Sequence, residues 1–349
     1  MKTIKIFSAL ILTLIILSCS GKEGVIDNTN KSWYFLASVD SPNGAIMKVE
    51  MPAGTIISND LFSEKNSRTL DGKVEKIVSF RDNIFLIIPS TFKIEVVNKT
   101  TFISVATVDY SSLGLAPTDI CFANATDAYV AHGRDSVVSI LDLTNFVIAR
   151  QIITGSHPVA ITSSGNQIFV ADQLDNNIAV IDSRTHNVEA KIPVQTAPTY
   201  IATNSTGEKI IVVSLGAGKL DGTSAKSAAQ VSLIDVQSRT VIKTKEIASG
   251  STNPKDVVPS GLIVSKYDMG YISTQINLYS YDTRSGERLS FVDSSPYIMA
   301  SYSSVRDELM LLNQTNETFK AVFFNLESYS ETASYIFTKS VNFLFPVLN

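Results

Sequence analysis

Cysteine, histidine and clustered basic charge are all scarce in this chain of 349 residues. With only two cysteines, Cys19 and Cys121, the chain cannot carry the disulfide framework of a small secreted fold. There are three histidines, and no Cys/His spacing resembles a zinc motif. The formal net charge is −4 and no run of five or more lysines and arginines occurs, which disfavours a nucleic-acid-binding protein. We therefore expect no bound metal, no cofactor and no nucleic-acid partner.

Helical periodicity is also missing from the body of the chain. Hydrophobic residues make up 44% of the sequence and charged residues 18%, which suits a folded core and not a disordered chain. Short apolar segments alternate with turn-forming residues, so an all-β fold with few helices is expected. Cys121 lies in such a segment, Ile120-Cys-Phe-Ala123, and is interpreted as a small buried hydrophobic residue.

The longest apolar run is at the N-terminus. Lys2 and Lys5 precede the run at residues 6–17, which is short for a membrane span but typical of a signal peptide. Residues 16–19, Ile-Leu-Ser-Cys, then resemble the lipobox of bacterial lipoproteins. An aliphatic residue stands three positions before the cysteine, and a small residue stands directly before it.

The lipobox resemblance implies a mature protein that begins at Cys19. Residues 1–18 would be removed as the signal peptide, Cys19 would carry the lipid, and residues 19–31 would form a flexible tether. Ser20 follows the cysteine instead of an aspartate, which in families with a sorting rule favours the outer membrane. We therefore expect an outer-membrane lipoprotein, on the cell-surface or periplasmic side, held to the membrane through Cys19. An ordinary secretory signal with a chance cysteine is the alternative.

A repeat of about 40 residues organises the rest of the chain. A proline before an apolar strand recurs at Pro117, Pro158, Pro198, Pro254 and Pro296, and the long interval after Pro198 contains an insertion. Turn-forming residues divide each copy into four short segments. Each copy is therefore expected to form four antiparallel strands, A to D, within one domain spanning residues 32–349.

The strands of the repeat have a recognisable sequence. In the clearest copy the second reads Gln167-Ile-Phe-Val-Ala-Asp172 and the third reads Asn177-Ile-Ala-Val-Ile-Asp182. These strands, with a Gly-x-x-Pro corner, resemble the YVTN-type repeat of YncE-like and surface-layer-associated β-propellers. The resemblance is strong over residues 117–236 and implies a seven-bladed β-propeller of four-stranded antiparallel blades, with six or eight blades as alternatives. The aspartates that end strand C are expected to cap the next turn: Asp142, Asp182 and Asp235.

The first copy of the repeat lacks strand A. Trp33-Tyr-Phe-Leu-Ala37 aligns with strand B, and residues 45–50 and 55–58 follow as strands C and D. The C-terminal segment Val341-Asn-Phe-Leu-Phe345 is a spare strand. Because open sheet edges invite aggregation, we expect this strand to complete blade 1 and close the ring.

Candidate binding residues gather on the face that carries the D-to-A and B-to-C loops. The insertion, residues 215–230, is a Gly- and Ala-rich B-to-C loop of blade 5, and long loops commonly carry binding function. The polar and aromatic residues expected on this ligand-binding face are His132, Arg134, His157, Asp172, Asp175, Tyr200, Lys219, Asp256 and Tyr297. Tyr200, Asp256 and Tyr297, near strand A starts, are expected close to the central channel, where aromatic walls would suit a small ligand.

No catalytic residue is predicted, because the sequence places neither a nucleophile beside a base nor a pair of carboxylates. His132 and His157 belong to neighbouring blades and, with Asp172, would be the alternative of a metal site. His186, in a C-to-D turn, is expected at the opposite face in solvent.

The sequence therefore favours a non-enzymatic binding lipoprotein of the cell envelope. It would hold a small ligand or a partner protein on the face that carries residues 215–230. Some lipoprotein propellers that resemble this repeat class capture corrinoids for outer-membrane transporters, which implies a similar role by analogy. A propeller enzyme of the lactonase or quinoprotein-like type and an envelope scaffold protein are the alternatives.

Overall fold

The computed structural model describes residues 32–38, 42–51, 54–220, 226–248, 253–304, 306–315, 318–328, 330–337 and 341–347. The predicted signal peptide, the lipid anchor at Cys19 and the tether lie outside these residues, as do residues 221–225 of the insertion. No helix of the described residues is long and apolar enough to cross a membrane.

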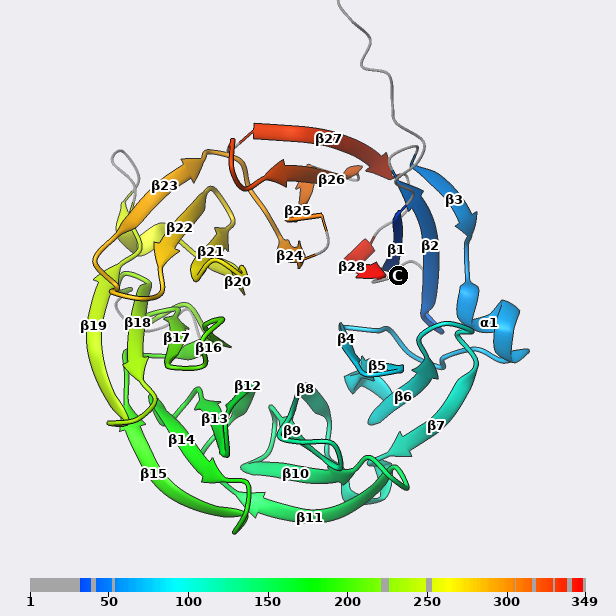
Figure 1. Ribbon diagram of the computed structural model, residues 1–349, viewed down its shortest axis with the longest axis horizontal. Coiled ribbons are helices and arrows are strands. Elements are labelled where there is room, and N and C mark those ends of the chain that lie inside the picture. Colours follow the sequence, from blue (N-terminus) through cyan, green and yellow to red (C-terminus); the bar gives the residue numbers. More distant parts are fainter. Residues whose placement is uncertain are drawn as a thin grey trace, which may run out of the picture. The chain divides into compact units, whose positions relative to one another are not determined.

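The described residues of the propeller form seven four-stranded antiparallel sheets around a central axis (Figure 1). The predicted all-β, seven-bladed propeller is therefore confirmed. In each blade, strand A lies nearest the axis and strand D lies outermost. From strand A to strand D, blade 1 consists of β28 (Val341–Val347), β1 (Ser32–Ser38), β2 (Ala45–Met51) and β3 (Thr55–Ser58). Blade 2 consists of β4 (Lys76–Phe80), β5 (Asn83–Ile88), β6 (Lys93–Asn98) and β7 (Ser104–Asp109). Blade 3 consists of β8 (Pro117–Phe122), β9 (Asp127–His132), β10 (Val137–Asp142) and β11 (Val147–Ile153), and blade 4 consists of β12 (Pro158–Ser164), β13 (Gln167–Asp172), β14 (Asn177–Asp182) and β15 (Asn187–Pro193). Blade 5 consists of β16 (Pro198–Thr203), β17 (Lys209–Ser214), β18 (Gln230–Asp235) and β19 (Thr240–Glu246). Blade 6 consists of β20 (Pro259–Val264), β21 (Met269–Thr274), β22 (Leu278–Asp282) and β23 (Leu289–Asp293). Blade 7 consists of β24 (Met299–Ser303), β25 (Glu308–Thr315), β26 (Thr318–Asn325) and β27 (Ser330–Phe337).

The hydrophobic core consists of layers between adjacent blades. Along β13, Ile168 and Val170 pack with blade 3, whereas Phe169 and Ala171 pack with blade 5, as the two-residue period of a strand requires. Cys121 is a buried free thiol in the layer between blades 3 and 4, as predicted, and burial raises its pKa. Burying one aliphatic side chain contributes about 1.5–3 kcal/mol, so these layers hold neighbouring blades together.

Aspartates at the end of strand C turn the chain, as predicted. Asp142, Asp182 and Asp235 each accept the backbone N–H of a residue two or three positions further on, at 2.7 Å. The side-chain hydrogen bond from Arg184 holds the pKa of Asp182 well below its usual range. These carboxylates are therefore structural.

Helices are few among the described residues, as expected. The short helix α1 (Leu61–Asn66) begins after Asp60, whose side chain accepts the backbone N–H of Ser63 at 3.2 Å, and it buries Leu61 and Phe62. Three single-turn 3₁₀ helices complete the set: η1 (Pro89–Thr91), η2 (Ser111–Leu113) and η3 (Pro254–Asp256).

The predicted starts of blades 6 and 7 were wrong. Strand A of blade 6 begins at Pro259, while Pro254 lies in η3. Pro296 precedes blade 7, whose strand A begins at Met299. Pro259, like Pro198, is followed by a shift of register against strand B. In the structure, the repeat proline is therefore identified by the β-bulge that follows it. The spacing of prolines in the sequence does not reveal this bulge.

The C-terminal strand lies beside the first strand of the propeller. β28 is hydrogen bonded to β1 in the order β28-β1-β2-β3, with Trp33 opposite Val347 and Ala37 opposite Phe343. It takes the inner position of that sheet (Figure 1). That the ring depends on this pairing for its closure stays a prediction.

Candidate functional site

The insertion after β17 marks the end of the blades at which strands A begin. The backbone N–H of Leu215 donates to Ala197 O at 2.9 Å, and Ala197 directly precedes β16. Lys219 Nζ donates to Leu215 O at 2.8 Å, so this side chain is tied back onto its own loop.

His132 is enclosed within blade 3, although the sequence placed it on the open face. It is 0% exposed, and its Nε2 lies 2.9 Å from Ser139 Oγ, which donates to the Tyr110 hydroxyl at 3.3 Å. Burial lowers the pKa of His132 to about 4, so the ring is neutral at physiological pH. A histidine beside a serine is a familiar catalytic pairing, but here full burial makes it a hydrogen-bonded link between strands.

Asp172 is likewise buried, whereas Asp175 is exposed. Asp172 is 0% exposed; its Oδ1 accepts from Thr154 Oγ1 at 3.1 Å and its Oδ2 has no hydrogen-bond partner. Burial raises the pKa of Asp172 to about 7. Asp175 Oδ2 accepts the backbone N–H of Ser156 at 2.9 Å. Of these two carboxylates, only that of Asp175 is open to solvent.

The remaining loop candidates lie apart from one another. Arg134 is exposed, and His157 is partly buried with a φ of 65°. Asp256 forms an exposed ion pair with Lys226 of the insertion, with Nζ 3.6 Å from Oδ1. Tyr297 is 2% exposed in the layer between blades 6 and 7. Neither Asp256 nor Tyr297 is among the described residues that line the central cavity, although both were expected close to the channel.

The alternative of a metal site at His132, His157 and Asp172 is not formed. Within the part of the chain that the structure describes, no three His, Cys, Asp or Glu side chains meet in a metal-binding arrangement. His186 was expected in solvent, but it is partly buried, and its Nδ1 lies 2.6 Å from the Tyr129 hydroxyl.

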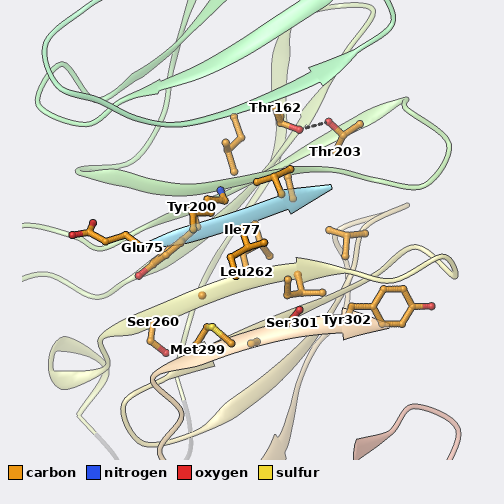
Figure 2. Close-up of a pocket in the computed structure, with 18 of the residues that line it drawn as sticks. Glu75, Ile77, Thr162, Tyr200, Thr203, Ser260, Leu262, Met299, Ser301 and Tyr302 are labelled. Atoms are coloured by element: carbon orange, nitrogen blue, oxygen red, sulfur yellow. Dashed lines mark hydrogen bonds between the residues drawn. The ribbon is translucent and has the colours of Figure 1, made fainter. Parts of the chain in front are cut away.

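A cavity of about 790 Å³ lies between the inner strands. Its walls come mainly from β4, β16, β20 and β24, and β12 contributes Thr162 (Figure 2). Tyr200 is the one residue of the nine sequence candidates that lines the described part of this cavity. Ligand pockets in proteins are commonly about 300–1,000 Å³, so this cavity is the candidate binding site.

The cavity wall changes in character along its length. Ile77, Ile201 and Leu262 occupy equivalent positions of three A strands and form an apolar layer of the wall. Figure 2 shows Ile77 and Leu262 near the middle of the cavity. Two residues further along β4 and β16, Ser79 and Thr203 bring hydroxyl groups to the wall. Since side chains two apart share one face of a strand, an aliphatic layer is followed by a hydroxyl-bearing one.

Three hydroxyl groups of the cavity wall have donated their protons to the protein. Thr203 donates to Ser163 O at 2.9 Å, so Thr162, whose Oγ1 lies 2.8 Å from that of Thr203, is the donor in their mutual bond. Tyr302 donates to Asp307 Oδ1 at 2.7 Å. These three hydroxyl oxygens can still accept hydrogen bonds.

Charged groups come from Glu75 and Lys76, at the start of β4. Figure 2 shows Glu75 toward the end where strands A begin, and Glu75 is exposed there. Lys76 forms an ion pair with the buried Asp119 of β8, which also accepts the backbone N–H of Ile161 at 3.1 Å. Tyr200 is largely buried among these strands, and burial raises its pKa. The charge of Lys76 is therefore already balanced within the wall.

Sequence reasoning missed most of the cavity. Ile77, Leu262 and Met299 are apolar residues near the start of strand A, and none of them was among the sequence candidates. The available signal was their position: strand A of a propeller borders the axis, so residues just after the repeat proline can face the channel. Polar loop residues were a weaker guide to the cavity than position on strand A.

No family model matches the chain, and no curated protein matches it. Among solved structures, it is similar to the periplasmic gluconolactonase of Pseudomonas aeruginosa, with 13% identity over 91% of this chain and 99% of that one and a TM-score of 0.68. A functionally unknown protein from Desulfotomaculum acetoxidans is 13% identical over 87% of this chain and 98% of that one, with a TM-score of 0.64. The Pan2 WD40 domain of Neurospora crassa is 8% identical over 80% and 82%, with a TM-score of 0.58. At identities this low, the similarities show that the chain has a β-propeller fold and do not assign it to a family.

Proposed function

We propose that this chain is a lipid-anchored, non-enzymatic binding protein of the bacterial cell envelope that holds a small molecule in its central cavity. The observation that carries the proposal is the cavity of about 790 Å³, with aliphatic walls at its middle and hydroxyl groups toward one end. A mostly apolar pocket with a few polar groups is the usual form of a small-molecule site. The insertion lies at the end where strands A begin and supports a role in covering the entrance.

The charged groups of the cavity support binding over acid–base chemistry. Glu75 is the one carboxylate among the described lining residues, and it is exposed. Lys76, the one lysine there, is engaged by Asp119. General acid–base catalysis uses groups held in reach of the reacting atoms with shifted pKa values, and this wall offers mainly aliphatic and hydroxyl groups instead.

A ligand screen tests the cavity. The mature chain from Cys19, carrying Cys19→Ser so that no detergent is needed, would be heated with corrinoids, haem, oligosaccharides and neutral amphiphiles. A ligand should raise the unfolding temperature in proportion to RT ln(1 + [L]/Kd). Leu262→Asn in the wall should reduce that shift, whereas Leu174→Asn, at a side chain 58% exposed, should leave it unchanged. If no compound shifts the transition, or both variants respond alike, the cavity is not the site.

The anchor has its own test. Cells expressing the full chain and fed an alkyne-tagged fatty acid should label it through Cys19, because the lipobox-like segment precedes that residue. Cys19→Ser should lose the label and leave the membrane fraction. Cys121→Ala, at the buried cysteine, should keep both. Label that persists in Cys19→Ser would rule out this anchor, and with it the envelope tether.

Lactone hydrolysis is the second candidate. The similarity to a periplasmic gluconolactonase over 91% of this chain favours it over other enzyme reactions. Gluconolactone ring opening, followed by acid release at constant pH, should scale with protein concentration and fall in Glu75→Gln. A rate equal to that in buffer alone would exclude the gluconolactone reaction.

A further inference from the structure

We propose that the central cavity takes an uncharged, mainly aliphatic alcohol. Its hydrocarbon body would lie against Ile201 and Leu262, and its hydroxyl group would lie at Thr162 and Thr203. This inference rests on the proposed function, since it names the class of molecule that the cavity would hold.

The apolar layer selects a hydrocarbon body. Ile201 of blade 5 and Leu262 of blade 6 are half-buried, so both can present aliphatic surface to the ligand. Ile77 of blade 2 is 2% exposed and packs in the layer between blades 1 and 2, and Met299 of blade 7 is 9% exposed, so these two side chains back the wall. A bound hydrocarbon would remove its own surface and this wall from water together, which is the main source of affinity in such a pocket.

The hydroxyl layer selects a hydrogen-bond donor. Thr203 gives its proton to Ser163 O, and Thr162 gives its proton to Thr203. Both oxygens retain accepting capacity, so the ligand that pairs with them must bring an O–H or N–H group. An ester or ketone of the same shape could accept from another wall hydroxyl, such as that of Ser79, but it leaves the two threonine oxygens unsatisfied.

The placement of charge disfavours ionised ligands. Lys76 is bound to Asp119 and is not free to pair with a carboxylate head group. Glu75 is exposed at the end where strands A begin, whereas Thr162 and Thr203 lie toward the other end (Figure 2). An ammonium group beside the threonines would therefore lose its hydration without gaining a carboxylate.

The size of the cavity sets the size of the ligand. If each heavy atom occupies about 30 Å³, the volume of a water molecule in the liquid, about 790 Å³ holds roughly 25 heavy atoms. In a series of primary alcohols, each added methylene should tighten binding about fourfold until the cavity is full.

Matched amphiphiles test the ligand class. Octan-1-ol, decan-1-ol and dodecan-1-ol, then decanoate and decylammonium at pH 7.5, would be titrated calorimetrically into the mature Cys19→Ser chain. We expect affinity to rise through the alcohol series and decan-1-ol to bind at least tenfold more tightly than either ion. Equal or tighter binding of decanoate or decylammonium would overturn the alcohol assignment.

Two variants locate the bound molecule. Leu262→Asn should weaken decan-1-ol binding at least tenfold, and Thr203→Val, which keeps the side-chain shape, should weaken it about fivefold by removing an acceptor. The exposed controls Leu174→Asn and Thr240→Val should bind as the parent does. Unfolding curves of all four confirm that each is folded. Unchanged binding in both cavity variants would overturn the placement.

The outcomes separate this inference from the function on which it rests. If a corrinoid or oligosaccharide binds, loses affinity in Leu262→Asn and excludes decan-1-ol, the cavity is a ligand site and the alcohol class is wrong. If no compound binds and Leu262→Asn changes nothing, both the alcohol class and the cavity function are wrong.

Discussion

At the scale of single residues, one position of the repeat buries a polar side chain whose hydrogen bonds are incomplete in two blades. His132 and Asp172 both end strand B. His132 is bound to Ser139, which corresponds to Ala179 in the blade of Asp172, and its Nδ1 has no hydrogen-bond partner among the described residues. Asp172 keeps the hydrogen bond from Thr154 and leaves its second oxygen without a partner. Burial without full compensation disfavours the charged form of a carboxyl group, which explains the raised pKa of Asp172.

This raised pKa predicts a pH-dependent stability. The pKa of Asp172 is about 7 in the folded chain, above its ordinary value of 3.8, so the group contributes most below pH 4 and loses that contribution as pH rises to about 7. In this range, the free energy of unfolding should fall by up to about 1.4 kcal/mol per pH unit. We expect Asp172→Asn to remove this slope, so that the variant gains stability relative to the parent as pH rises.

Urea unfolding at pH 4, 5, 6, 7 and 8 measures the effect. Asp256→Asn is the control, because Asp256 is exposed and pairs with an exposed lysine. If the difference in unfolding free energy between Asp172→Asn and the parent stays constant over this range, the pKa of Asp172 is the same in the folded and the unfolded chain.

At the scale of elements, one buried carboxylate ties three inner strands together. Asp119 of β8 binds Lys76 of β4 and accepts the backbone N–H of Ile161 of β12 at 3.1 Å. Asp119→Ala should destabilise the chain by about 2 kcal/mol, since hydrogen bonds to a charged group are lost and Lys76 is left without its partner. Asp71→Asn, in an exposed pair with Lys93 at 3.7 Å, should cost less than about 1 kcal/mol. Chemical unfolding that gives equal losses for the two variants would contradict the role of Asp119.

The strands and turns also show which features of the fold could be predicted from the sequence. Alternation and turn residues act locally, so the strands and the turn-capping aspartates Asp142 and Asp182 were predicted correctly. The start of blade 6 was not, because an insertion shifts the spacing and Pro254 resembles the true repeat residue Pro259. The cavity was missed except for Tyr200, because its lining comes from several blades and no local pattern marks residues that meet only across the axis.

At the scale of the whole molecule, the blades depend on one another in a ring. Each core layer is shared by two neighbours, so a blade that loses a strand exposes apolar surface on both sides and an unpaired sheet edge. β28 pairs with β1 across the greatest sequence separation in the propeller. We therefore expect that local folding of the remaining blades does not replace this contact.

Removal of β28 tests whether this pairing closes the ring. A chain ending at residue 340 should lose the backbone bonds between β28 and β1, so β1 should exchange its amide hydrogens faster and the protein should self-associate through that edge. A chain ending at residue 347 retains β28 and is the control. A synthetic peptide of residues 341–349 should restore slow exchange at β1 when added to the truncated chain. A truncated chain that stays monomeric, with parent-like exchange and unfolding midpoint, would show that the blades hold the ring closed without the C-terminal strand.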